Sequence, residues 1–181
     1  MSFGGRVTLI NSVLDSIPTY VMSLFPIPDS VVNKLDRLRR NFLWKGNKEK
    51  GKYNLVELEV TQLRKEHKGL AIKNLGIQNR CLLMKWLWRF CDEETSLWKE
   101  VIIQKFGQNS PWCSNEVNCT YGTGVWRAIR GLWSKLQENS KFRVGNGNNV
   151  RFWKDSWIGE VPLQDKFPDL MLLSRNPEIV V

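Results

Sequence analysis

The sequence predicts a mainly α-helical fold, a bundle of helices with a small β-hairpin in the C-terminal third. Apolar residues recur at intervals of three and four through much of the 181-residue chain, as they do along one face of a helix. Hydrophobic residues make up 42% of the chain and include nine tryptophans, so a core of ordinary size is available without disulfides or metals. Glycine and proline mark the breaks between the predicted helices.

The first predicted helix covers residues 5–17. Its apolar residues keep the helical spacing: Val7, Ile10, Val13, Leu14 and Ile17. Pro18 disfavours helical geometry in the residue before it, so the helix is expected to end or kink there. A short second helix is expected over residues 19–25, and Pro26 and Pro28 bracket a turn.

The next helix is expected to start at Asp29 or Ser30, either of which can cap it, and to end near Leu43. Its apolar residues fall within about 60° on a wheel of 100° per residue and predict a core stripe: Val31, Leu35, Leu38 and Phe42. Its basic residues lie together on a separate face: Lys34, Arg37 and Arg40. This division between a core face and a basic face favours a helix that faces phosphates.

The central part of the chain predicts a basic, glycine-containing loop over 45–54, a short helix over 54–63 and a brief extended piece over 69–72. Apolar residues cover most of the wheel over 74–91, which predicts a helix buried on several sides, with Trp86 and Trp88 in the core. A further helix is expected over 97–106, with Gly107 as its C-terminal stop.

The polar stretch from residue 108 to 122 is expected to be a linker between a helical region, 1–107, and a C-terminal region, 123–181. The C-terminal region should begin with a helix capped by Thr123 that carries four apolar residues on one face: Trp126, Ile129, Trp133 and Leu136. Segments 141–144 and 149–153 flank Gly-Asn-Gly-Asn and predict a β-hairpin, followed by a turn-rich, tryptophan-containing tail and a weak helix.

The formal net charge of +9 is concentrated in one part of the chain. Residues 34–89 hold 15 Lys/Arg against 5 Asp/Glu, an excess of 10, whereas the remainder sums to −1. Such a segment is typical of a surface that faces a polyanion. A solvated basic face that only keeps the protein in solution would give the same pattern, and charge alone does not separate the two.

Catalytic and metal-binding patterns are not expected here, and neither is a cofactor. The chain has no Asp-Asp pair, and Asp92-Glu-Glu94 is typical of a turn at a helix end. His67, the only histidine, is expected to be a solvated loop residue. The spacing of Cys113 and Cys119 fits no common zinc motif. Four dispersed cysteines without an export signal indicate reduced thiols and an intracellular protein, and no apolar run is long enough to span a membrane.

Several stretches together resemble one protein family. They are residues 2–20 beginning Ser-Phe-Gly-Gly-Arg, Leu24-Phe-Pro-Ile-Pro28, residues 35–44, residues 69–89, residues 96–107, residues 145–159 with Arg151-Phe-Trp-Lys-Asp155-Ser-Trp157, and residues 161–170 ending in Phe167-Pro-Asp-Leu170. This order resembles the region that follows the polymerase palm in the reverse-transcriptase-like proteins of plant LINE-type (non-LTR) retrotransposons.

The resemblance implies a thumb-like helical bundle that helps to hold template and primer. It also implies an RNA-directed DNA polymerase family, whose catalytic aspartates this chain lacks. A non-catalytic fragment is therefore expected, with RNA or an RNA–DNA hybrid and the missing palm domain as partners and with no membrane partner. The residues expected to bind nucleic acid are Lys34, Arg37, Arg40, Lys45, Lys48, Lys50 and Lys52.

The resemblance also implies a chain cut at both ends. Met1 stands where the family usually has an internal leucine, and the sequence stops before the family's zinc-binding or ribonuclease H segment. Two other functions stay open. The chain could be an inert relic that exposes apolar surface along Val7–Ile17, where the palm is lost, or an accessory piece of a polymerase completed in trans. The nucleus is one expected location.

Overall fold

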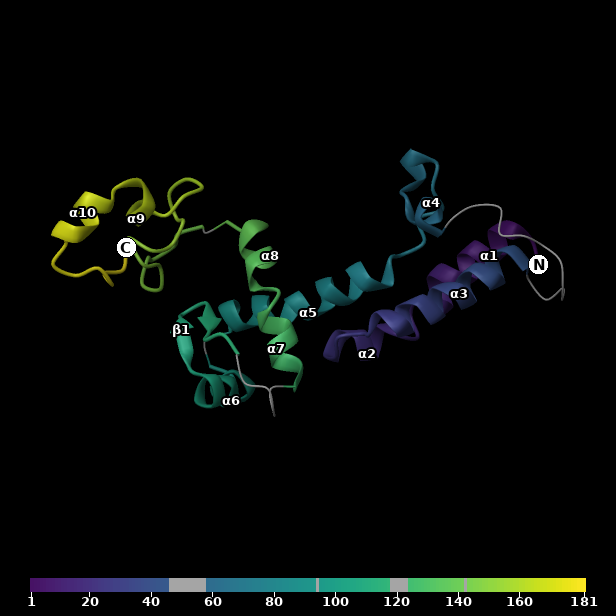
Figure 1. Ribbon diagram of the computed structural model, residues 1–181, viewed down its shortest axis with the longest axis horizontal. Helices are drawn as coiled ribbons and strands as arrows, with labels where there is room; N and C mark the ends of the chain where they lie inside the picture. The colour runs from purple at the N-terminus through teal and green to yellow at the C-terminus, as the bar shows by residue number, and fades with distance from the viewer. Residues whose placement is uncertain (46–57, 94, 118–123, 142) are drawn as a thin grey trace.

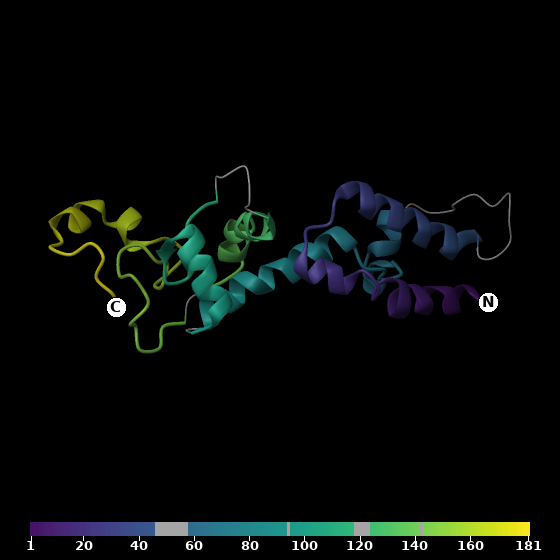
Figure 2. The same ribbon diagram turned by 90° about the horizontal axis from the view of Figure 1, so that it is seen from below.

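A computed structural model describes residues 1–45, 58–93, 95–117, 124–141 and 143–181. It confirms the mainly α-helical fold with one small antiparallel hairpin. Figures 1 and 2 show an elongated molecule in which α5 (Leu75–Asp92) runs from an N-terminal group of helices to a C-terminal group. The N-terminal group contains α1 (Phe3–Leu9), α2 (Thr19–Leu24), α3 (Asp29–Lys45) and α4 (Leu58–Gln62). The C-terminal group contains α6 (Leu97–Phe106), β1 (Gln108–Ser110), β2 (Cys113–Ser114), α7 (Gly124–Arg130), α8 (Trp133–Glu138), α9 (Leu163–Lys166) and α10 (Pro168–Leu173).

The first helix contains a π-helical turn that its sequence pattern does not indicate. After α1, the backbone widens over Ile10–Leu14, and the Asp15 N–H donates to the Ile10 carbonyl at 2.9 Å. The extra residue in this turn rotates the rest of the apolar stripe. Ile10 and Asp15 are therefore fully buried, while Val13 and Ile17 are exposed. The break predicted at Pro18 is confirmed, since α2 begins at Thr19.

The N-terminal group packs around a cluster of three buried residues, Ile10, Leu43 and Ile72. Ile72 reaches this cluster through a turn, because the Leu70 and Ala71 N–H groups donate to the carbonyls of residues 61 and 63. The extended piece predicted over 69–72 is therefore wrong, and Ala71 has a positive φ of 53°. Gly69 passes so close to the Leu63 carbonyl that an added Cβ would lie 2.0 Å from its oxygen.

Helix α5 joins the two groups, which makes it central to the core as predicted. Its buried residues follow one face: Leu75, Asn79, Leu83, Leu87 and Phe90. The last three of these pack with Val117, Trp126 and Ile129 in a second hydrophobic cluster. The opposite face is exposed, so the prediction of burial on several sides is wrong, and Trp88, predicted as core, is 59% exposed. Trp86 is half-buried, and its Nε1 donates to the Ser23 carbonyl at 2.8 Å.

Helix α6 begins and ends as the sequence predicts, and a turn built around Glu93 connects it to α5. The two carboxylate oxygens of Glu93 accept hydrogen bonds from Arg89 Nε and Trp98 Nε1, both at 2.7 Å. The Glu93 carbonyl accepts from Lys99 Nζ at 2.7 Å. For the described residues Asp92 and Glu93, the predicted helix-end turn is confirmed. Gly107 ends α6 with a φ of 77°.

The Glu93 turn predicts a pH-dependent contribution to stability. The hydrogen bonds from Trp98 and Arg89 lower the pKa of Glu93 from its ordinary value of 4.5. Because the folded state holds the proton less tightly than the unfolded state, the stabilisation is complete above pH 4.5 and is lost as the pH falls through the lower pKa of the folded protein. Glu93→Gln keeps the acceptor for Trp98 and removes the charge. Urea unfolding from pH 7 to pH 3 should therefore show a smaller loss of stability for this variant, and identical pH profiles would contradict the assignment.

The hairpin of the C-terminal group lies at β1 and β2, where Gln108 pairs with Ser114 and Ser110 with Cys113. The described part of the predicted linker, residues 108–117, thus contains the hairpin, and the division of the chain into regions stays a prediction. The helix predicted from Thr123 lies outside the described residues at its first position. Beyond that point it is divided into α7 and α8 at Gly131 and Leu132.

The hairpin predicted at 141–144 and 149–153 is absent from the described part of that stretch. The second arm pairs instead with the C-terminal residues: the Phe152 N–H donates to the Ile179 carbonyl at 2.8 Å, and the Val181 N–H donates to the Val150 carbonyl at 2.9 Å. Gly147 supplies the positive φ, 75°, that the turn requires, and an added Cβ would lie 2.3 Å from the Val181 carbonyl oxygen. The glycine–asparagine turn therefore forms, with a different partner strand.

Candidate nucleic-acid interface

Helix α3 presents Lys34 and Arg37 on an exposed face. Neither side chain pairs with an acidic group among the residues that the structure describes. Residues three apart on a helix are neighbours on its surface, so the two cations form one basic patch. Leu38 lies beside them and is 63% exposed. This face of α3 is therefore basic with apolar contact area, and it is available to a partner.

The core stripe predicted for α3 is displaced around the helix. Val31 and Leu38, predicted to be buried, are exposed, whereas Arg39 and Leu43 are buried. At 100° per residue, the centre of the buried face lies about a quarter turn from the predicted stripe. The reason is Arg39, a charged residue that a hydrophobic pattern assigns to the surface and that the structure places inside.

Arg39 is 3% exposed and joins three segments of the N-terminal group. Its Nη2 lies 2.8 Å from Asp15 Oδ1 and donates to the Lys73 carbonyl at 2.7 Å, while its Nη1 donates to Asp36 Oδ1 at 2.7 Å. The π-helical turn places Asp15 in this position. The charge of Arg39 is thus neutralised inside the protein, and its role is to hold α3 in place so that the opposite face stays exposed.

Asp15 is fully buried, and burial raises its pKa above the ordinary value of 3.8. The positive charge of Arg39 opposes this shift. Lys73 opposes the shift as well, through its charge and its backbone. Because the Asp15 carboxylate is desolvated and Arg39 is its ion-pair partner, the site is sensitive to the loss of Arg39.

Of the other five predicted site residues, the structure describes the side chain of Arg40 alone. Arg40 is half-buried, and its Nε lacks a hydrogen-bond partner among the described residues, so it contributes less to the exposed basic patch than Lys34 and Arg37 do. Lys48, Lys50 and Lys52 lie outside the described residues, and so does the side chain of Lys45. The structure therefore brings together two of the seven predicted residues as an exposed pair.

Further cations that were not predicted as site residues surround the segment that follows α4. This segment contains a 3-10 turn (Lys65–His67), and its exposed basic side chains are Arg64, Lys65, Lys68 and Lys73. Because Arg39 binds the Lys73 carbonyl, this segment is tied to α3. The charge excess of residues 34–89 is the sequence signal that could have identified them.

The aromatic and basic segment Arg151–Lys154 serves the fold. Asp155 accepts from the Arg151 N–H at 2.8 Å and from Arg151 Nη2 at 3.0 Å, and Lys154 pairs with Glu178. Trp157 Nε1 donates to the Phe152 carbonyl at 2.9 Å, and Trp153 Nε1 donates to Ser174 Oγ at 3.3 Å. The residue types of this motif are thus explained by contacts within the C-terminal tail.

The described part of the chain contains no group of three or more His, Cys, Asp or Glu side chains that could hold a metal ion. His67 is exposed, as predicted. Cys81, Cys91 and Cys113 are free thiols, and Cys119 lies outside the described residues. Among the described helices, none is both long enough and apolar enough to cross a membrane.

Two relatives of the chain come from Arabidopsis thaliana. One is named as a ribonuclease H-type protein and is 34% identical over 168 residues, a match that covers 90% of this chain and 27% of that protein. The other is an uncharacterised mitochondrial protein, 26% identical over 153 residues, a match that covers 82% of this chain and 97% of that protein. No protein-family model and no solved structure gives a significant match. The chain thus spans little more than a quarter of the first relative, and the two matches support a plant retroelement-related protein.

Proposed function

We propose that the chain is a non-catalytic part of a LINE-type reverse transcriptase, an RNA-directed DNA polymerase, and that it binds RNA or an RNA–DNA hybrid through α3. The observation that carries this proposal is the exposure of Lys34 and Arg37 on α3 while Arg39 fixes the opposite face of the helix inside the protein. The match to one region of a longer ribonuclease H-type relative supports a segment of a multidomain element.

Helix α3 has dimensions that suit contact with a nucleic-acid backbone. Its 17 residues span about 25 Å at 1.5 Å per residue. Lysine and arginine that reach phosphates release condensed counterions, so binding of this kind is weakly sequence-selective and strongly dependent on salt. The exposed Leu38 adds apolar contact area beside the cations. These features favour a surface that holds the backbone and does not read bases.

The placement of the carboxylates supports a non-catalytic role. The buried carboxylates among the described residues are Asp15 and Asp155, and each pairs with an arginine. Glu93 is occupied by Arg89 and Trp98. A two-metal polymerase site requires a cluster of free carboxylates, and the sequence contains no Asp-Asp pair.

The same proposal assigns the palm domain to the exposed side of the first helices. Apolar and aromatic side chains gather there over the π-helical turn, α2 and the residue that follows it: Val13, Ile17, Tyr20, Val21 and Phe25. Apolar surface of this kind is typical of an interface between domains. The palm is therefore the partner that we propose for this side of the N-terminal group.

Replacing Lys34 and Arg37 together by alanine is expected to weaken binding to a fluorescein-labelled RNA–DNA hybrid. Fluorescence anisotropy at two salt concentrations measures both the affinity and its salt dependence. Each lost phosphate contact should reduce the slope of log K against log salt by about 0.7–0.9, so the double variant should lose about 1.5 from the slope.

The matched control removes two exposed cations at the other end of the chain, Lys166 and Arg175. It changes the net charge by the same amount. If this control weakens binding as much as the Lys34/Arg37 variant does, the interaction follows net charge alone, and the assignment of α3 is wrong. A folded chain that does not bind the hybrid at low salt would contradict the proposed function.

A further inference from the structure

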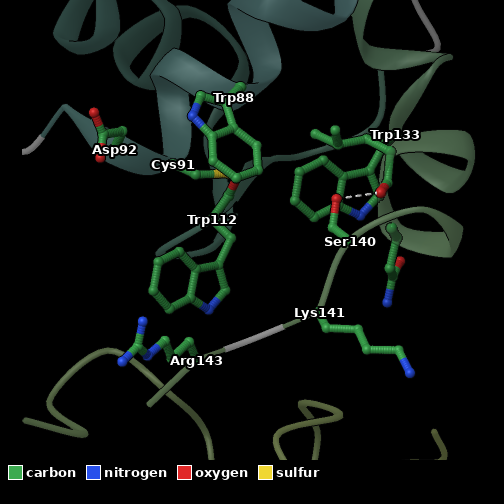
Figure 3. Close-up of a pocket in the computed structure, with 10 residues that line it drawn as sticks. Trp88, Cys91, Asp92, Trp112, Trp133, Ser140, Lys141 and Arg143 are labelled. Atoms are coloured by element: carbon green, nitrogen blue, oxygen red, sulfur yellow. Dashed lines mark hydrogen bonds between the residues drawn. The ribbon is translucent and has the colours of Figure 1, made fainter. Parts of the chain in front are cut away.

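A pocket of about 340 Å³ lies at the C-terminal end of α5 (Figure 3). Three of its walls are tryptophans from separate elements: Trp88 from α5, Trp112 from the turn between β1 and β2, and Trp133 from the start of α8. The remaining lining residues are Cys91, Asp92, Leu136, Gln137, Ser140, Lys141 and Arg143. The volume is within the range of small-ligand sites, and three of the ten lining residues are tryptophans.

Two of the three tryptophans make contacts within the protein. The Trp112 carbonyl accepts from Cys91 Sγ at 3.3 Å, and Trp112 Nε1 donates to Asp155 Oδ2 at 3.3 Å. The Arg130 guanidinium lies 5.9 Å from the centroid of the Trp133 ring. Because these contacts restrict Trp112 and Trp133 before any ligand arrives, a planar group that stacks on these two rings has less to order. Trp88 is 59% exposed and presents its ring to the pocket from α5.

The pocket carries more positive than negative charge. Lys141 and Arg143 line it with one carboxylate, Asp92 (Figure 3). Burial raises the pKa of Cys91 to about 11, so the thiol is neutral at physiological pH and adds no negative charge to the wall. Lys141 lies 3.5 Å from Glu160, but both side chains are more than 80% exposed, and such a pair is weak and readily exchanged.

The exposed face of α5 leads to this pocket. Lys85 lies on the face that also carries Ile77, Cys81 and Trp88, opposite the buried residues of the helix. Lys85 precedes Trp88 by three residues, so the two side chains are neighbours on the helix surface. Cations beside exposed aromatic rings are the combination with which proteins bind single-stranded nucleic acid.

We propose that the pocket holds one unstacked base of a single-stranded nucleic acid, with the base against the tryptophans and its phosphate at Arg143 and Lys141. The aromatic walls fit the flat face of a base, and the two cations fit the phosphate attached to it. This inference deepens the proposed nucleic-acid binding, on which it rests, and it adds a second contact surface at the far end of α5 from α3 (Figure 1).

The test uses fluorescein-labelled oligouridine and oligodeoxyuridine of about 10 nucleotides, which differ only in the sugar and have a length typical of single-strand sites. Binding to the full chain is measured by anisotropy. Trp88→Ala is expected to weaken binding tenfold to a hundredfold, as loss of one stacking partner does, and Trp88→Phe should restore most of the affinity. Since Trp88 is largely exposed, neither change disturbs the core. Comparison of the two oligomers tells whether the pocket prefers ribose or deoxyribose.

The matched control is Phe167→Ala, which removes an exposed aromatic ring outside the pocket and should leave binding unchanged. Photocross-linking of oligomers that carry 4-thiouridine should attach the base to lining residues of the pocket. If Trp88→Ala binds as tightly as the unmodified chain, or if the cross-links map to other surfaces, the pocket proposal is overturned.

The outcomes separate this inference from the proposed role of α3. If the Lys34/Arg37 variant loses hybrid binding while Trp88→Ala keeps its oligomer binding, the α3 surface is supported and the pocket proposal fails. If Trp88→Ala loses oligomer binding while the Lys34/Arg37 variant keeps its hybrid binding, the pocket is supported and the α3 proposal fails.

Discussion

Replacing Arg39 by methionine is expected to lower the free energy of unfolding by about 3–5 kcal/mol. Methionine fills much of the same space but leaves the fully buried Asp15 carboxylate without its positive partner. It also removes the donors to Asp36 and to the Lys73 carbonyl. Breaking a buried ion pair from one side strands the remaining charge in a desolvated site, which costs more than the pair itself contributes.

The matched control is Arg37→Met, which makes the same chemical change two residues earlier, on the exposed face of α3. Urea unfolding followed by circular dichroism should show a change within about 0.5 kcal/mol for this control. A double variant, Arg39→Met with Asp15→Leu, should recover part of the loss because it no longer buries an unpaired carboxylate at position 15. If Arg37→Met and Arg39→Met cost the same, the ion-pair network does not anchor α3.

Local signals in the sequence predicted the boundaries of the elements well. Pro18 lies in the break between Leu14, where the first helical stretch ends, and Thr19, where α2 begins, and Gly107 ends α6 with the positive φ that glycine favours. Both residues act through their own backbone geometry, so the sequence around them is sufficient. The turn at Asp92 and Glu93 was also predicted from the local sequence, because these acids directly follow an apolar helical stretch.

Features set by long-range contacts were not predictable in this way. The stripe of α3 is displaced because Arg39 is neutralised by Asp15, which a π-helical turn 24 positions earlier brings into contact. The strand at Val150–Phe152 pairs with the C-terminal residues, although a turn signal precedes it directly. In each case, two segments far apart in the sequence decide the result.

In the candidate site, too, the features set by local sequence were predicted and those set by long-range contacts were not. Exposure of Lys34 and Arg37 follows from the helical spacing of charge and was predicted, whereas Arg40 is half-buried against the protein. The tryptophan pocket could not be predicted, because Trp88, Trp112 and Trp133 meet only after three separate elements have packed. The sequence pattern assigned Trp88 to the core because apolar residues surround most of this helix. Such a pattern does not show which face of the helix remains uncovered once the other elements have packed.

Replacing Asn79 by leucine is expected to cost about 2–4 kcal/mol of unfolding free energy, because three backbone groups lose their partner. Asn79 is buried on α5, and its Nδ2 donates to the carbonyls of Met22 and Phe25 at 2.7 and 2.8 Å. Its Oδ1 accepts from the Ile27 N–H at 3.0 Å. In a continuing helix, the Met22 carbonyl would accept from residue 26, but Pro26 has no N–H. Asn79 therefore supplies the donor that the proline removes.

The comparison that tests this role is Asn74→Ala, a second asparagine of the same helix. Asn74 is exposed. It caps α5 by accepting from the Ile77 N–H, and its Nδ2 donates to Gln62 Oε1 at 2.9 Å, so the loss of this exposed cap should cost about 1 kcal/mol. Asn79→Asp keeps an acceptor for Ile27 but sets a carboxylate against two carbonyl oxygens, and it should be at least as destabilising as Asn79→Leu.

Asn79 joins α5 to the turn between α2 and α3, so its loss should also loosen α3. Amide hydrogen exchange of α3 should therefore rise in Asn79→Leu and stay unchanged in Asn74→Ala. Equal unfolding free energies for the Asn74 and Asn79 variants would show that the turn is held by its apolar contacts and that Asn79 contributes no more than an ordinary cap.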